Sequence, residues 1–200
     1  LPPLVHQAVM DSLNCFKTNE DHVLVECTGN ISHLLLADGI TAIADRVFQD
    51  GNLLTEITFT PTVISIGQSA FAGCKWLRIV RQAGSVTSIG DLAFAGCQTL
   101  EAVELSESFL HMGIRAFENC TSLREILLPE GLEEIPDRAF FRCHSLRRVS
   151  LPSTLKRIGK EAFAFCRNLA MPSVPEGTII EERAFTEISD EEERSCTTAD

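Results

Sequence analysis

The fold is decided by a stretch that recurs along the chain, Gly113-Ile114-Arg115-Ala116-Phe117-Glu118-Asn119-Cys120-Thr121-Ser122-Leu123-Arg124-Glu125-Ile126-Leu127-Leu128-Pro129. The phenylalanine of this stretch falls at Phe48, Phe71, Phe94, Phe117, Phe140, Phe163 and Phe185. The first five steps are 23 residues long and the last is 22. A repeat of this length is typical of a solenoid, in which each copy forms one coil that stacks on the next.

Each copy contains a short alternating segment, which predicts a strand. Ile126 and Leu128 face the interior, while Glu125 and Leu127 face outward. Pro129 ends the strand because proline has no N–H to donate to a ladder. Further on, an Ala-Phe pair followed three residues later by cysteine predicts one tight helical turn.

A single copy cannot bury its own apolar edge, but stacked copies can. Strands of neighbouring coils then lie about 4.8 Å apart in a parallel sheet. We therefore expect an α/β solenoid, a right-handed superhelix of about seven coils of 22–23 residues. One side carries the parallel β-sheet and the opposite side carries short helical or 3-10 turns. Each phenylalanine should stack on that of the preceding coil.

The most regular copy reads Leu146-Arg147-Arg148-Val149-Ser150-Leu151-Pro152-Ser153-Thr154-Leu155-Lys156-Arg157-Ile158-Gly159-Lys160-Glu161-Ala162-Phe163-Ala164-Phe165-Cys166. It resembles the BspA-like (Treponema pallidum-type) leucine-rich repeat family, which occurs in bacterial surface proteins and in many protozoa. The resemblance covers about residues 25–188. It implies a leucine-rich repeat fold and a role in adhesion and protein binding, and nothing more specific.

The two ends depart from the repeat. Residues 1–24 carry apolar residues at helical spacing over 4–16, so we expect an N-terminal capping helix that shields the first coil. The alternative is the tail of an upstream domain. The array fills residues 25–188, and its seventh rung should be irregular because Pro172 falls in the strand. Residues 189–200 should form an acidic C-terminal cap or a disordered tail.

The charge and hydropathy of the chain bear on its partners and location. Of the net charge of −11, residues 176–200 carry −7, from nine acidic residues and two arginines. This balance argues against a nucleic-acid partner, which needs a basic face. No apolar run approaches 18 residues, so we expect no membrane span in this fragment. The family resemblance implies a surface or secreted location; the cytoplasm is the alternative.

Five of the eight cysteines share one repeat position, namely Cys74, Cys97, Cys120, Cys143 and Cys166. We interpret them as a column of small, buried, unpaired thiols. Stacked side chains point the same way and suit a disulfide poorly. A Cys15–Cys27 disulfide near the first coil is left open. The sequence has no CxxC or Cys-His cluster typical of a zinc site.

No motif in the sequence demands catalysis. It contains no P-loop, HExxH, GxSxG or dinucleotide-binding fingerprint, and its five histidines occupy different repeat positions. Cys143 and His144 are adjacent, but Cys143 belongs to the buried column. We therefore expect no enzyme, and hence no catalytic residue, bound metal or cofactor.

The outward strand positions form columns at the 23-residue step, and these columns are the candidate protein-binding face. Arginine beside exposed apolar side chains is favoured at protein interfaces. The alternative is that facing charges pair across strands and only keep the sheet soluble. The candidate residues are Glu56, Arg78, Ile79, Arg81, Glu101, Glu104, Arg124, Glu125, Leu127, Arg147 and Arg148.

The sequence thus predicts a non-enzymatic protein-binding leucine-rich repeat module whose ligand, a protein of unknown identity, is recognised by the exposed face of the parallel sheet. The alternatives are the repeat region of a cell-surface adhesin, an intracellular scaffold or regulatory array fused to another domain, and a structural spacer without a partner. On the first prediction, changing Arg124, Arg147 and Arg148 together to Glu should abolish partner capture without unfolding the array.

Overall fold

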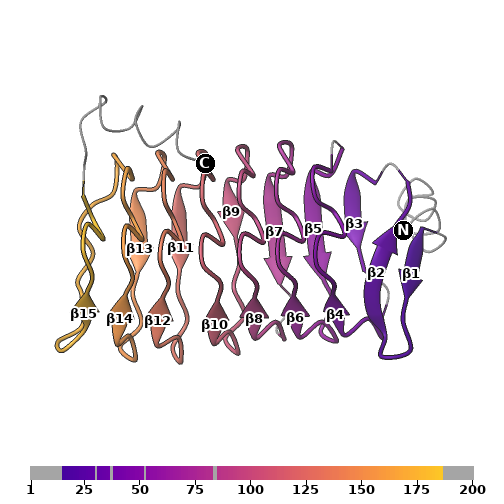
Figure 1. Ribbon diagram of the computed structural model, residues 1–200, viewed down its shortest axis with the longest axis horizontal. Helices are drawn as coiled ribbons and strands as arrows, with labels where there is room; N and C mark the ends of the chain where they lie inside the picture. The colour runs from indigo at the N-terminus through magenta and orange to yellow at the C-terminus, as the bar shows by residue number, and fades with distance from the viewer. Residues whose placement is uncertain (1–14, 30, 37, 52, 83–84, 187–200) are drawn as a thin grey trace.

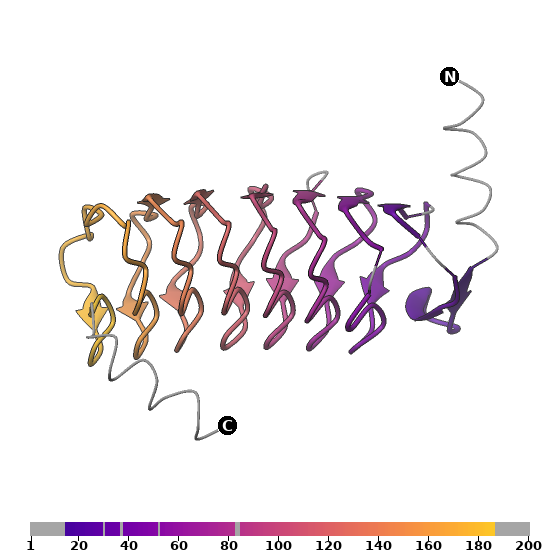
Figure 2. The same ribbon diagram turned by 90° about the horizontal axis from the view of Figure 1, so that it is seen from above.

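The computed structural model describes residues 15–29, 31–36, 38–51, 53–82 and 85–186. Over these residues the chain winds into coils that follow one another along a single axis (Figure 1). Seen from above, successive coils lie side by side in a row as loops of similar shape (Figure 2). The expected parallel-sheet solenoid of about seven coils is confirmed.

The first ladder of strands is formed by the alternating segments. Its members are β3 (His33–Leu35), β5 (Glu56–Phe59), β7 (Ile79–Gln82), β9 (Ala102–Val103), β11 (Glu125–Leu127) and β13 (Arg148–Ser150). Neighbours pair in parallel with the register set by the repeat, so Glu56 lies beside Ile79 and Glu125 beside Arg148. The ladder is interrupted between β9 and β11 and ends at β13. The seventh coil adds no strand to this first ladder, which confirms the irregular rung expected from Pro172.

A second ladder, which we did not predict, runs along another side of the coils. Its members are β2 (Val23–Cys27), β4 (Ala42–Ile43), β6 (Ser65–Ile66), β8 (Ser88–Ile89), β10 (His111–Met112), β12 (Glu134–Ile135), β14 (Arg157–Ile158) and β15 (Ile179–Ile180). The residue after each strand extends the ladder, as when the Gly67 N–H donates to the Ile43 carbonyl at 2.8 Å. Pro136 takes this place after β12 and has no N–H, and the ladder is interrupted between β10 and β12.

The N-terminal end of the second ladder carries one antiparallel strand. β1 (Phe16–Thr18) pairs with β2, and β2 in turn pairs in parallel with β4. The boundary that we expected at residue 24 therefore falls inside a strand of the array. Of the capping helix expected over residues 4–16, all but the last two positions lie outside the described residues, and Phe16 begins β1. The C-terminal cap or tail, residues 189–200, also lies outside them.

The short helical or 3-10 turns expected around each phenylalanine do not form in the described residues. The segment is instead a pair of tight turns, closed by bonds such as Cys74 N–H to the Phe71 carbonyl at 3.2 Å. Ser69 and Gly73 both have positive φ, which breaks helical winding. The N–H groups of Ser69, Phe71 and Gly73 then donate at 2.8 Å to carbonyls of the following coil. The turns therefore make a third line of hydrogen bonds between coils.

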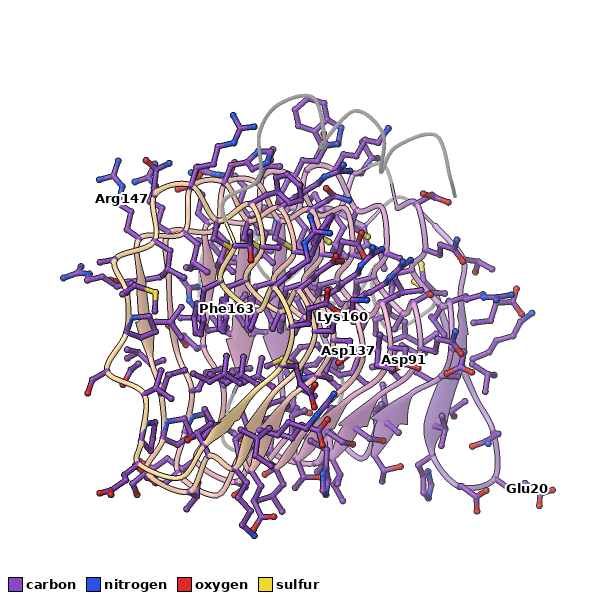
Figure 3. The ribbon with its side chains drawn as sticks, turned by 60° about the vertical axis from the view of Figure 1, so that its left-hand side comes forward. Glu20, Asp91, Asp137, Arg147, Lys160 and Phe163 are labelled. Carbon is purple, nitrogen blue, oxygen red and sulfur yellow. The ribbon has the colours of Figure 1, made fainter. Side chains whose placement is uncertain are left out.

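The core is a stack of phenylalanine rings, as the repeat predicts. Consecutive rings from Phe48 to Phe185 lie 5.0–5.5 Å apart between centroids and within 6° of parallel. Phe163 lies inside the coils, whereas Arg147 projects from their outer surface (Figure 3). Burying each ring contributes about 1.5–3 kcal/mol.

The cysteine column is also confirmed. All five members are free and buried, and each thiol donates to the carbonyl of a phenylalanine 26 residues earlier, as Cys97 does to Phe71 at 3.2 Å. Burial raises the pKa of the Cys74 thiol to about 11 and the pKa of the Cys97 thiol well above its ordinary value. Cys15 and Cys27 are not bridged to each other, and burial raises the pKa of Cys27 to about 11.

Candidate protein-binding face

The candidate face consists of the outward side chains of the first ladder. The twofold alternation of each strand turns Ile126 into the core and leaves Leu127 exposed, as predicted. Because the register between strands follows the repeat, the eleven candidate residues lie in adjacent columns on one side of the molecule. Strand pairing thus fixes the spacing of this face.

Several charges on the face pair across neighbouring strands. Arg78 contacts Glu101 at 2.8 Å, and Arg148 contacts Glu125 at 2.8 Å. Arg81 forms a further ion pair with Glu56. Exposed pairs of this kind contribute only about 0–1 kcal/mol each. These six residues therefore show the arrangement that we gave as the alternative, in which facing charges pair across strands.

Three other candidate charges are placed differently. Among the described residues, the side chains of Glu104, Arg124 and Arg147 form no ion pair or hydrogen bond. Arg124 and Arg147 are both exposed and occupy the same position in consecutive coils, where the Arg147 N–H donates to the Arg124 carbonyl. The two guanidinium groups therefore form a cationic margin beside β11 and β13.

A hollow of about 510 Å³ opens at the C-terminal end of this face. It is lined by β11 and β13 residues and by the strandless part of the seventh coil, namely Glu125, Leu127, Arg148, Val149, Ser150, Leu151, Ala170, Met171, Pro172 and Ser173. Leu127 and Met171 are the apolar residues most open to solvent here, at 72% and 69% exposed. The hollow lies where Pro172 keeps the chain from continuing the sheet.

The structure divides the candidate residues into two groups. Glu125, Leu127 and Arg148 line the hollow, and Arg124 and Arg147 lie next to it. The others belong to the coils of β5, β7 and β9, where Ile79 is half-buried, and do not line it. We missed Met171 and Pro172 as site residues. Met171 shares the column of Glu125 and Arg148, and that column is the signal that could have identified it.

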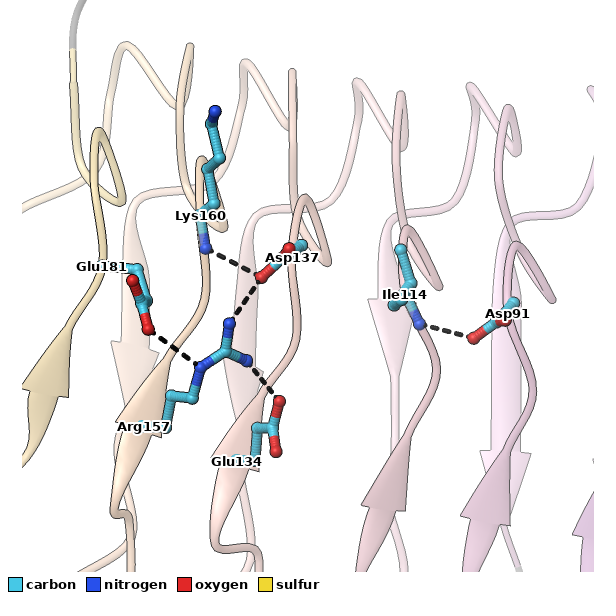
Figure 4. Close-up of polar contacts among 7 residues, drawn as sticks. All are labelled: Asp91, Ile114, Glu134, Asp137, Arg157, Lys160 and Glu181. Atoms are coloured by element: carbon cyan, nitrogen blue, oxygen red, sulfur yellow. Dashed lines mark hydrogen bonds and ion pairs between the residues drawn. The ribbon is translucent and has the colours of Figure 1, made fainter.

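A separate charged cluster lies on the second ladder and spans three coils (Figure 4). Arg157 contacts Asp137 at 2.9 Å and Glu181 at 3.3 Å, and it also pairs with Glu134. The Asp137 carboxylate in addition accepts the Lys160 N–H at 2.9 Å, just as Asp91 accepts that of Ile114 at 2.7 Å. These contacts tie each coil to the next, so we interpret the cluster as structural.

Within the described part of the chain, no group of three or more His, Cys, Asp or Glu side chains is placed to hold a metal ion. The same residues include no helix with the length and apolar character needed to cross a membrane.

Comparison with known proteins agrees with this geometry. The stacked parallel coils, with an exposed strand face and buried turns, define a solenoid of the leucine-rich repeat class. The model of the BspA type leucine-rich repeat region matches residues 14–101 and 78–192, with six copies. The chain therefore belongs to the BspA-type leucine-rich repeat family. Among curated proteins, none matches the chain.

Solved structures show the same fold. A leucine-rich repeat protein from Bacteroides ovatus is 30% identical with a TM-score of 0.74, and the match covers 84% of this chain and 48% of that one. A leucine-rich cell surface protein from Faecalibacterium prausnitzii is 26% identical with a TM-score of 0.64, covering 78% and 52%. A T. pallidum leucine-rich repeat protein, 22% identical with a TM-score of 0.60 and covering 78% and 89%, shares the fold. This chain spans about half the length of the first two.

Proposed function

We propose that this chain is a non-enzymatic module that binds another protein through the outward face of the first ladder, at the hollow beside β11 and β13. The observation that supports the proposal is the pair of exposed apolar side chains, Leu127 and Met171, on a face whose other strands carry paired charges. Apolar side chains beside arginine are the usual core of a protein interface.

The cationic margin indicates what charge a partner should carry next to the hollow. Arg124 and Arg147 lie beside the hollow and use no carboxylate of the described residues. A partner that places an apolar side chain between Leu127 and Met171 and a carboxylate near the margin fits this arrangement. Charged groups at the rim mainly affect the rate and selectivity of association, whereas the apolar centre sets its lifetime.

The proposal is tested by affinity capture with the immobilised chain. Changing Leu127 and Met171 together to Asp should remove the captured protein, because two buried charges would then meet its apolar contact. Both side chains are exposed in the free module, so the array should melt as before. The matched control is Ile64→Asp, an exposed isoleucine outside the first ladder. Equal capture by the double variant and the control would assign binding to another surface.

We further propose a cell-surface location, which is supported by the cell surface protein among the structural neighbours. Protease treatment of intact cells of the source organism should digest the protein while leaving a cytoplasmic marker whole. Complete protection of the protein until the cells are lysed would favour the intracellular array instead.

A further inference from the structure

The first ladder has an open edge at β13, within the face that we propose to bind. In an earlier coil the following strand completes the ladder, as when the Glu104 N–H donates to the Val80 carbonyl at 3.0 Å. The equivalent bond of the seventh coil, from the Ser173 N–H to the Val149 carbonyl, does not form in the described chain. The row of first-ladder arrows accordingly ends at β13 (Figure 1).

Two backbone N–H groups on the same edge also have no acceptor. The Leu128 N–H donates to the Ser150 carbonyl of the next coil at 3.1 Å, whereas the equivalent Leu151 N–H meets no acceptor among the described residues. Because the Ser150 carbonyl faces β11, the backbone groups of Val149 before it face the seventh coil. The N–H of Val149 is not paired there either, within the part of the chain that the structure describes.

These backbone groups border the hollow of about 510 Å³. Its lining includes Val149 and Leu151 on one side and residues 171–173 on the other. The Ala170 N–H donates to the Arg147 carbonyl at 3.0 Å, so the seventh coil is still attached to the sixth just before the hollow. The volume lies in the range of about 300–1,000 Å³ that is usual for binding clefts.

An earlier interruption of the first ladder provides a contrast. The ladder is also broken between β9 and β11, but there the next coil supplies a strand, and β11 contacts β9. After β13 the next coil supplies no strand to this ladder. A strand edge with unpaired N–H and C=O groups is a template for pairing with another extended chain.

We propose that the partner protein contributes an extended segment, which binds in the hollow as an added strand along β13. Backbone carbonyls of the segment accept the Val149 and Leu151 N–H groups, and one of its N–H groups donates to the Val149 carbonyl. The inference rests on the proposed function and adds the conformation in which the partner is recognised.

The outward side chains of the added strand continue the columns of the face. Its position beside Arg147 takes a carboxylate, because the side chains of Arg124 and Arg147 form no ion pair among the described residues. Its position beside Ser150 takes an apolar side chain, since the small Ser150 leaves Leu127 within reach. Arg147 and Ser150 are three residues apart, so the same spacing is expected between the acidic and the apolar residue of the segment.

A display library of random linear peptides, selected on the immobilised full chain, provides the probe. Peptides of about nine residues are long enough to form one strand. Enriched peptides should carry an acidic residue and an aliphatic residue three positions apart. A library that yields no enriched peptide, or only peptides without this spacing, would overturn the inference.

Amide hydrogen exchange locates the bound peptide. With an enriched peptide at saturation, the Val149 and Leu151 amides should exchange about tenfold more slowly, because they gain acceptors. The matched control is the amide of Val103, at the same repeat position two coils earlier, whose exchange should not change. Unchanged exchange at Val149 and Leu151 would overturn strand addition. If changing Leu127 and Met171 to Asp still removed the peptide, the proposed function would stand without it.

N-methylation of the enriched peptide, one residue at a time, tests the backbone pairing directly. Alternate residues of an added strand direct their N–H groups toward β13, so methylation should weaken binding about tenfold at every second residue. The residues between them are the internal control and should tolerate the methyl group. Equal effects at neighbouring residues, or no effect anywhere, would show that the peptide binds without joining the ladder.

Discussion

At the scale of single residues, the array depends on side chains and backbone atoms that meet across coils. Phe117 is stacked on both faces, by Phe94 at 5.4 Å and Phe140 at 5.5 Å, and is fully buried. Phe185 is half-buried and stacks on Phe163 alone among the described rings. A phenylalanine therefore contributes more to the free energy of unfolding at position 117 than at position 185.

We predict that Phe117→Ala lowers the free energy of unfolding by about 3–5 kcal/mol, because it removes ring contacts and leaves a cavity that neighbouring coils cannot fill. Phe185→Ala should cost clearly less. Urea unfolding of the two variants in parallel makes the comparison. Equal losses would contradict the two-sided stack.

At Gly90, which follows strand β8 of the second ladder, two backbones approach each other closely. A Cβ on Gly90 would lie 2.7 Å from the Gln68 nitrogen and 2.8 Å from the Gly67 carbonyl carbon. A Cβ on Gly96 would meet nothing closer than 3.7 Å, although its φ is +73°. The two glycines thus resist substitution for different reasons.

We predict that Gly90→Ala costs more stability than Gly96→Ala. The first must separate two coils, whereas the second imposes only a left-handed alanine at about 1–2 kcal/mol. Thermal melts of both variants and of the parent provide the measurement. A Gly96→Ala loss that matched or exceeded that of Gly90→Ala would show that backbone crowding is not the limiting factor.

At the scale of elements, side-chain contacts reinforce the backbone ladders near the C-terminal end. Arg157, in β14, contacts carboxylates of the coil before it and of the coil after it. Among the described residues, the side chain of its neighbour Lys156 forms an ion pair with Glu133 alone, at 2.7 Å, and is more exposed. Networks of several charges contribute more than isolated exposed pairs.

We expect Arg157→Met to loosen the attachment of the last coil. Amide hydrogen exchange at Ile179 and Glu181, whose N–H groups donate to the preceding coil at 2.9 Å, should accelerate. Lys156→Met, the matched control, should leave these amides nearly as protected as in the parent. Unchanged exchange in Arg157→Met would mean that the ladder alone holds the coil.

The elements also show what the sequence could and could not predict. Strong alternation identified the first ladder, and Pro172 marked its end. The second ladder has mostly two-residue strands, too short for alternation to reveal. The helical turn was expected because residues such as Leu92 and Arg142 give no sign of their positive φ. The hollow beside β13 depends on the path of the seventh coil, which residue spacing alone does not specify.

At the scale of the whole molecule, the column of buried thiols couples stability to pH. Burial raises the pKa of Cys74 to about 11 and raises the pKa values of Cys97, Cys120 and Cys143 well above the ordinary value. In the unfolded chain these thiols ionise near their ordinary pKa of 9.0. Above that pH the unfolded state loses protons that the folded state keeps, so alkali favours unfolding.

We predict that the buried thiols leave the free energy of unfolding independent of pH below about pH 8. The free energy of unfolding then falls as the pH rises from 9 toward 11. Each retained proton contributes about 1.4 kcal/mol per pH unit. Urea titrations between pH 7.5 and 10.5 under reducing conditions measure the slope. Cys74→Ala should reduce this slope by the contribution of about one proton, about 1.4 kcal/mol per pH unit. A slope that is identical in this variant would place the alkaline sensitivity elsewhere.

Successive coils follow one another at a constant step, so the number of coils sets the length of the array. The coils from Phe71 to Phe163 offer their neighbours the same ring and the same thiol, so a unit of 23 residues can be duplicated or deleted there while the ring and thiol contacts of the remaining coils are kept. The length of such a protein can therefore change by unequal recombination in steps of one coil. The outward side chains of each coil can change independently of the others.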